Sequence, residues 1–128
     1  MLEIALNSEQ QGIYQKDIAQ NQKLSFKYLD QIISALKSAG LIENVKGKKS
    51  GYKLGRPPEK ITMYDIHRAC EGEICVVSCL CSKQKCPVED RCAPRNFWAG
   101  LNKNIKDYLS TYTLEELTHE QIDINSLL

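Results

Sequence analysis

The segment spanning residues 25–54 constrains the fold more than any other. Apolar residues there follow a helical spacing and then change directly to the apolar–polar alternation that is typical of strands. The helical part has four apolar residues at three- and four-residue spacing: Phe26, Leu29, Ile33 and Leu36. This spacing predicts a helix with one buried stripe, capped at its start by Ser25 and stopped in a left-handed conformation at Gly40. The alternating part predicts a β-hairpin, two short strands on either side of a basic turn at residues 47–51.

Further helices are predicted on both sides of this segment. Residues 1–8 and 13–20 have helical patterns, and a short polar connection at 21–24 leads from them to Ser25. After the hairpin, Thr62 and Asp65 have the spacing of a capping box, which predicts another helix that ends before the cysteine-rich segment.

A final long helix is predicted from Pro94, which suits a first helical turn. Its apolar residues step by three and four in the manner of a coiled-coil seam: Trp98, Leu101, Ile105, Tyr108 and Tyr112. Thr113 and Glu116 predict a capped short helix followed by a polar tail. The predicted fold class is therefore mainly α with a small β-hairpin.

Charge is distributed unevenly along the chain. Residues 1–60 carry ten Lys and Arg against six Asp and Glu, a net charge of +4, whereas residues 61–128 carry seven against ten, a net charge of −3. The densest basic run contains no acidic residue: Lys46, Lys48, Lys49, Lys53 and Arg56. Such a run favours a polyanionic partner, although a solvated basic loop is the alternative and charge alone does not decide.

The order helix, short connection, helix and hairpin is typical of a winged helix-turn-helix, whose second helix enters the major groove of DNA. On this interpretation the front of that helix offers Lys27, Tyr28 and Gln31, near an N-terminus whose amide dipoles favour phosphate. The hairpin tip then lies along the DNA backbone or in the minor groove as a wing. Ordinary amphipathic helices beside a hairpin are the alternative, but the element order, the lengths and the basic tip together favour DNA binding.

Cysteines are confined to one short segment: Cys70, Cys75, Cys79, Cys81, Cys86 and Cys92. A cluster this local favours metal ligation or redox chemistry over a disulfide framework, which would join distant segments. Cys79, Cys86 and Cys92 form one candidate triplet for an iron–sulfur cluster, and Cys81 can replace Cys79 in another. Zinc is less favoured because paired C-x2-C motifs are absent. Disulfides formed in air are a further alternative.

Several classes of protein are disfavoured by the sequence. The chain has no apolar run of membrane-spanning length and no secretory signal, so we expect a cytoplasmic protein without a membrane partner. It also has no phosphate-binding loop, Ser–His–Asp arrangement or paired-carboxylate site, so we do not expect an enzyme.

Three segments carry a resemblance to a known family. They are the run DIAQNQKLSFKYLDQIISALKSAGLIENVKGKKSGYKL, the following RPPEKITMYDIHRACEG, and the cysteine loop with the Trp98-bearing helix after it. In this order they resemble the iron–sulfur-cluster winged-helix transcription regulators of the IscR and NsrR type, over nearly the whole chain.

The resemblance implies a homodimeric repressor that binds an inverted-repeat operator in double-stranded DNA and senses redox state, nitric oxide or iron–sulfur status. It implies that Cys79, Cys86 and Cys92 ligate a 2Fe–2S or 4Fe–4S cluster, which an aerobically prepared sample can lose. It also implies that the helix from Pro94, which carries the seam given above, is a dimerisation arm that packs across the DNA-binding domain of its partner. Together with the interpretation of helix and hairpin, it predicts these DNA-binding residues: Ser25, Lys27, Tyr28, Asp30, Gln31, Lys46, Gly47, Lys48, Lys49 and Tyr52.

The chain departs from the family pattern in three places. Ser50 stands where the wing commonly has glycine. Arg95 stands where IscR-like members carry a histidine ligand, which leaves the fourth ligand to Cys81, a partner-subunit residue or a small molecule. We also expect the first helix to be shorter than in family members. In those proteins the additional, earlier part of this helix includes basic residues that touch DNA.

The predicted organisation has three parts. Residues 1–72 form the winged helix-turn-helix domain, residues 73–93 the cluster-binding loop, and residues 94–128 the dimerisation helix with a C-terminal tail. The alternative function is a zinc- or thiol-containing protein-interaction module that uses the winged helix as a docking surface. A small electron carrier is less favoured, because the cysteines occupy a minor part of the chain.

Overall fold

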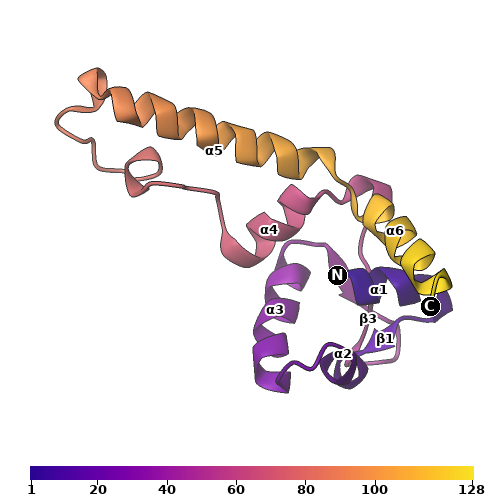
Figure 1. Ribbon diagram of the computed structural model, residues 1–128. Coiled ribbons are helices and arrows are strands. Elements are labelled where there is room, and N and C mark those ends of the chain that lie inside the picture. Colours follow the sequence, from indigo (N-terminus) through magenta and orange to yellow (C-terminus); the bar gives the residue numbers. More distant parts are fainter.

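A three-stranded antiparallel sheet organises the N-terminal half of the chain, and its strands lie in the order β1 (Ile13–Tyr14), β3 (Gly51–Leu54) and β2 (Ile42–Asn44). The computed structural model describes residues 1–128, apart from the side chain of Gln10. The elements are α1 (Leu2–Asn7), η1 (Ser8–Gln10), β1 (Ile13–Tyr14), α2 (Gln15–Asn21), α3 (Phe26–Ser38), β2 (Ile42–Asn44), β3 (Gly51–Leu54), η2 (Pro58–Lys60), α4 (Met63–Glu71), η3 (Ser78–Leu80), η4 (Glu89–Arg91), α5 (Ala93–Thr111) and α6 (Leu114–Ser126). Helix α5 projects as a long arm from the body that the sheet, α1, α2, α3 and α6 form (Figure 1).

Helix α3 begins and ends where its sequence predicts. The side-chain oxygen of Ser25 accepts a hydrogen bond from the backbone N–H of Tyr28 at 3.1 Å, which caps the start. At the other end Gly40 has a φ of +74°, and the amides of Gly40 and Leu41 donate to carbonyl groups of the last turn, both at 3.0 Å. This Schellman motif ends the helix and directs the chain into β2.

The buried face of α3 is narrower than its periodicity predicts. Leu29, Ile33 and Leu36 are 3%, 4% and 1% exposed, as expected for the stripe. Phe26, the fourth member of the predicted stripe, is 51% exposed, so its predicted burial is wrong. It occupies the first position of the helix, at one edge of the stripe, where the core no longer covers it.

Strand β1 is the one strand of the sheet that the sequence did not predict. The helical pattern over residues 13–20 predicts one helix, but Ile13 and Tyr14 instead pair with Tyr52 and Gly51 of β3, and α2 begins only at Gln15. The predicted hairpin is present as β2 and β3. The fold class, mainly α with a small β element, is therefore confirmed, and the sheet gains a third strand.

Helix α6 extends further than the predicted short helix and polar tail. The capping box of Thr113 and Glu116 starts it as predicted, but it continues to Ser126 and packs against α1 and η2. Thr62 forms the other predicted capping box, with Asp65, at the start of α4. The two caps lie side by side, because Thr62 and Thr113 form an isolated antiparallel bridge.

One hydrophobic core joins these elements. It consists of Ile4, Ile18, Leu29, Ile33, Leu36, Leu41, Ile42, Tyr52, Ile61 and Leu114. Among the described side chains, α5 contributes none to this core. No helix in the described part of the chain combines the length and apolar character needed to cross a membrane.

We predict that Leu114→Ala lowers the free energy of unfolding by about 2–5 kcal/mol, because it removes a fully buried side chain from the core and leaves a cavity. Urea denaturation measures this change. Leu127→Ala is the matched control, since Leu127 is 86% exposed and its removal should change stability by less than about 0.5 kcal/mol. Equal effects of the two substitutions would contradict the packing of α6 on the body.

Candidate DNA interface and cysteine loop

The front of α3 presents polar side chains to solvent. Five residues predicted to contact DNA are exposed at its start: Ser25, Lys27, Tyr28, Asp30 and Gln31. Tyr28 is 54% exposed although its side chain is large and aromatic. Because the apolar stripe of the same helix is buried in the core, this polar front faces away from the body.

The wing (residues 45–50) connects β2 and β3 and holds the other predicted DNA-binding residues except Tyr52. Lys46, Gly47 and Lys49 are exposed, and Lys48 is half-buried. The backbone N–H of Lys48 donates to the carbonyl of Val45 at 2.9 Å, which closes a β-turn. Gly47 is the third residue of this turn and has a φ of +81°, a conformation that glycine adopts without strain.

Tyr14 extends the basic surface of the wing, and no pattern in the sequence indicates this role. Its ring is 37% exposed at the end of β1, next to Gly51 of β3. The ammonium groups of Lys48 and Lys16 lie 5.5 and 5.8 Å from the centre of this ring, within the range of cation–π attraction. Lysines of the wing and of α2 are thereby gathered around one aromatic side chain.

Gln15 connects the wing to α3 and is a second residue that the sequence did not indicate. Its side chain is 3% exposed. Its amide nitrogen donates to Asp30 of α3, and its backbone N–H donates to the carbonyl of Ser50 at 2.9 Å. Its side-chain oxygen accepts from the hydroxyl of Tyr52 at 3.5 Å. Gln15 therefore fixes the front of α3 relative to the hairpin.

Tyr52 lies in the core rather than at the surface where its predicted DNA contact would place it. It is 6% exposed, because its side chain packs in the hydrophobic core, and its backbone lies in the central strand β3 between Ile13 and Asn44. Its hydroxyl faces Gln15. We therefore assign Tyr52 to positioning the wing and not to touching DNA.

The cysteine loop connects α4 to α5 and is anchored at its beginning. Ile74 is buried at 8% exposure, and the backbone N–H of Val76 donates to the side-chain oxygen of Asn102 of α5 at 3.0 Å. Cys75, between these two anchors, is bonded to Cys81. Four cysteines are free: Cys79, Cys86 and Cys92 are half-buried, and Cys70 is exposed.

Glu73 ties the beginning of the loop to both neighbouring helices. Its carboxylate accepts from the hydroxyl of Tyr64 at 2.8 Å and lies 3.7 Å from Arg68, both of α4. Lys106 of α5 approaches it to 3.4 Å. The Tyr64 hydrogen bond, reinforced by Lys106 and Arg68, holds the pKa of the Glu73 carboxyl below its ordinary value. The ionised carboxylate of Glu73 thus connects α4 to the arm α5.

The predicted seam of α5 remains uncovered within one chain. Its residues are exposed to 37% at Trp98, 38% at Leu101, 66% at Tyr108 and 36% at Tyr112, and Ile105 is half-buried. The neighbouring face of α5, which carries Asn102 and Lys106, contacts the loop and α4. The helix therefore offers an aromatic and aliphatic stripe beside the face that is already packed.

Comparisons with known proteins agree with this architecture. A family model described as "Rrf2: Iron-dependent Transcriptional regulator" matches residues 1–120. The chain belongs to the Rrf2 family. The HTH-type transcriptional regulator IscR of Xenorhabdus nematophila is 33% identical over 121 residues, which cover 94% of this chain and 73% of that protein. The similar proteins are named as regulators and not as enzymes, which agrees with the sequence interpretation.

Solved structures of Rrf2 type share the fold. CymR, the global cysteine regulator of B. subtilis, is 33% identical, with a TM-score of 0.71 over 93% of this chain and 87% of CymR. IscR of T. potens is 30% identical, with a TM-score of 0.72 over 94% of this chain and 78% of that one. The winged-helix assignment is confirmed by these likenesses.

The cysteine loop of this Rrf2 chain fits an iron–sulfur group in its donor chemistry. Three free thiols on an irregular segment are the ligands that such clusters use. The Nε donor of Arg95, at the start of α5, is buried with no hydrogen-bond partner among the described atoms, and an anionic cluster is the kind of group that supplies an acceptor. Among the described residues, no three His, Cys, Asp or Glu side chains lie close enough together to hold a metal ion.

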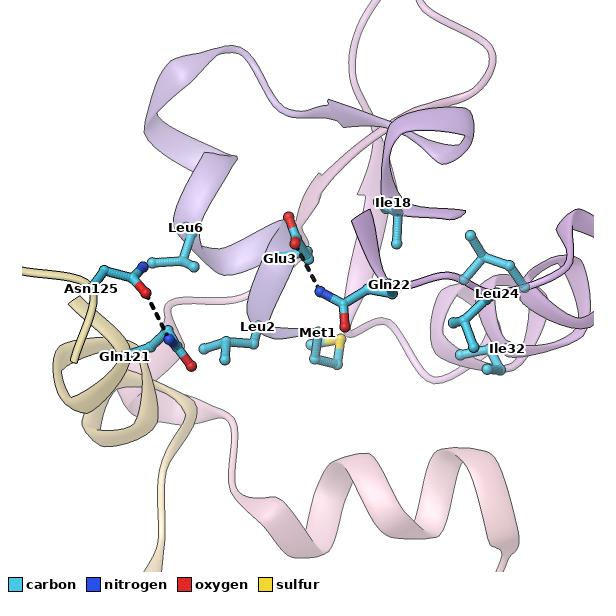
Figure 2. A pocket seen from close by; sticks show the side chains of 11 residues that line it. Met1, Leu2, Glu3, Leu6, Ile18, Gln22, Leu24, Ile32, Gln121 and Asn125 are labelled. Atoms are coloured by element: carbon cyan, nitrogen blue, oxygen red, sulfur yellow. Dashed lines mark hydrogen bonds between the residues drawn. The ribbon is translucent and has the colours of Figure 1, made fainter. Parts of the chain in front are cut away.

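A cavity of about 480 Å³ lies behind α3 and is separate from its polar front. Leu29 and Ile32 of α3 line one side of it. Figure 2 shows its polar wall, where Gln22 donates to Glu3 at 2.8 Å and Gln121 donates to Asn125 at 2.9 Å. These groups are paired with each other, so the cavity adds nothing to the DNA surface of this Rrf2 chain.

We predict that Gln15→Leu lowers the free energy of unfolding by about 1–3 kcal/mol, because the buried Tyr52 hydroxyl loses its partner. Urea denaturation of Gln15→Leu, Tyr52→Phe and the double variant measures the interaction free energy between the two side chains. The double variant should lose less stability than the two single variants added together, since both partners of one hydrogen bond are removed. Additive effects would show that the two residues act independently.

Proposed function

We propose that this Rrf2-family DNA-binding regulator is a homodimeric repressor that binds an inverted-repeat operator and senses redox state, nitric oxide or iron–sulfur status through a cysteine-ligated cluster. The observation that carries the proposal is the exposed polar front of α3 beside the basic wing, both fixed to one core by Gln15. DNA binding follows from family membership, and the other features go beyond it.

The front of α3 is suited to the major groove. Lys27, Tyr28 and Gln31 are exposed near its N-terminus, where side chains of a recognition helix reach base edges. The first-turn amides favour a nearby phosphate. Lys46 and Lys49 of the wing are exposed and suited to the DNA backbone or the minor groove. Asp30 is held by Gln15 and contributes by fixing the orientation of this surface.

The seam of α5 supports the homodimer. Aromatic and aliphatic side chains spaced by three and four residues suit helix-on-helix packing, and a second copy offers the same stripe. A twofold dimer places two α3 helices on successive turns of the major groove, which makes the operator an inverted repeat.

Cys79, Cys86 and Cys92 are the residues that would hold the cluster, and Cys81 is a fourth ligand only if its bond to Cys75 opens. The cluster, when bound, supplies electron transfer and reactivity toward oxidants. The chain itself supplies the thiolates and a junction with α5. Arg95 cannot take the place of a histidine ligand, because the guanidinium is a donor only.

We predict that Lys46→Ala combined with Lys49→Ala reduces the salt dependence of DNA binding. The slope of log K against log salt should become shallower by about 0.9 for each phosphate that the variant no longer neutralises. Fluorescence anisotropy with a duplex isolated by selection from random sequences measures this slope. Lys60→Ala is the matched control, since Lys60 is an exposed lysine outside the wing, in η2, which packs against α6. Identical slopes for the wing variant and wild type would contradict the wing assignment.

We predict that Cys86→Ala abolishes cluster retention because it removes a ligand. After anaerobic reconstitution with ferrous iron and sulfide, the wild type should show visible charge-transfer absorption and bound iron, and the variant neither. Cys70→Ala, which changes an exposed thiol of α4, should retain both. Circular dichroism should show the same helix content in all three. A colourless wild type that holds stoichiometric zinc would overturn the cluster and favour the protein-interaction alternative.

We predict that Leu101→Lys prevents dimerisation, because an unpaired ammonium group would be buried in the seam. Sedimentation velocity should detect monomers, and affinity for the inverted repeat should fall. Ser110→Lys places the same side chain at an exposed position on the opposite side of α5 and should leave the dimer intact. A dimeric Leu101→Lys variant would place the interface elsewhere.

A further inference from the structure

The bonded cysteines of the loop, Cys75 and Cys81, have no role in the three-thiolate ligand set proposed above. Their Cα atoms are 6.2 Å apart and they are six positions apart in the sequence. That separation lies within the range of about 4.4–6.8 Å that a disulfide spans without backbone movement.

Local structure brings the two residues together. Cys75 is fixed between the buried Ile74 and Val76, whose N–H is bonded to Asn102 of α5. The 3-10 turn η3 then reverses the chain, since the amides of Cys81 and Ser82 both donate to the carbonyl of Ser78, at 3.2 and 3.0 Å. The pair is therefore positioned by hydrogen bonds of the fold as well as by the bond itself.

The predicted ligand Cys79 lies inside the segment that this pair closes. With the Cys75–Cys81 bond present, the described residues gather no three candidate metal ligands, and the sulfur of Cys81 has no thiolate to offer. Opening the bond frees Cys81 two positions from Cys79 and removes one constraint on the turn that carries Cys79.

We propose that Cys75 and Cys81 form a reversible dithiol–disulfide couple, a second redox site in the loop, and that its oxidised form excludes the cluster. The second half of this inference rests on the proposed function, whereas the couple itself does not. The oxidant is a low-molecular-weight disulfide, the chemical class that exchanges with protein thiols.

The exchange proceeds in two balanced steps. The thiolate of Cys81, the exposed member of the pair, attacks one sulfur of the small disulfide, forms a mixed disulfide and releases one small thiol. The thiolate of the less exposed Cys75 then attacks the Cys81 sulfur, forms the Cys75–Cys81 bond and releases the second small thiol. The protein pair gives up two electrons and two protons, which the small disulfide takes up.

Anaerobically reduced full-length protein tests both parts with cystine as the oxidant. After treatment, differential alkylation and peptide mapping should find a single disulfide, between Cys75 and Cys81, which dithiothreitol reopens. Iron and sulfide uptake, measured afterwards by iron content and visible absorption, should be abolished in the cystine-treated wild type. Dithiothreitol should restore it.

Two variants keep the outcomes distinct. Cys75→Ser should take up iron equally with and without cystine, because the bond cannot form. Cys70→Ser is the matched control and should respond as wild type does, since Cys70 is exposed on α4 and desolvation raises its thiol pKa, which leaves less reactive thiolate. A disulfide mapped between a different pair of cysteines would overturn the proposed Cys75–Cys81 couple. Unchanged iron uptake in protein that carries the Cys75–Cys81 bond would overturn the proposal that the oxidised form excludes the cluster. If the reduced wild type takes up no iron at all, the proposed cluster is overturned, and its exclusion by the disulfide with it. Peptide mapping would still show independently whether Cys75 and Cys81 form the reversible disulfide.

Discussion

Burial of the apolar face of α3 is the interaction on which the rest of the structure depends. An isolated helix of 13 residues is marginal in water, so α3 is held by Leu29, Ile33 and Leu36 in the core. With that face buried, the opposite face must lie in solvent. The Schellman motif at Gly40 then fixes where β2 begins, and with it the position of the wing. The two surfaces proposed for DNA are therefore consequences of one packing arrangement.

Local sequence signals predicted the features whose causes are local. The caps at Ser25 and Thr62 each join residues three positions apart, so the sequence displays both partners. Strand β1 was missed because its two residues are defined by pairing with a segment far along the chain. The role of Gln15 was missed for the same reason, since a polar residue at the start of a helix gives no sign of being buried between Asp30 and Tyr52.

The cysteine loop shows a different limit of prediction. The sequence provides the number, type and spacing of its donor atoms, which suffice to suggest thiolate chemistry. It does not provide their arrangement, because the loop lacks the periodicity that would fix side-chain directions. The pairing of Cys75 with Cys81 depends on the turn η3 and on an anchor supplied by Asn102 of another helix. Likewise, the polar character of α6 conceals that Leu114 is a core residue.

The cysteine loop connects the body to the arm, because it joins α4 to α5. It leaves α4, whose Ile66 and Ala69 pack against the core, and it enters α5, which contributes no buried side chain among those described. Glu73 links α4 to Lys106 of α5, and the backbone of Val76 joins the loop to Asn102 of α5. A change of conformation in the loop that displaced either of these interactions would change the angle between arm and body. In a twofold dimer that angle sets the separation of the two α3 helices, which must match the repeat of the major groove. Chemistry at the cysteines would then alter DNA affinity through the geometry of the arm.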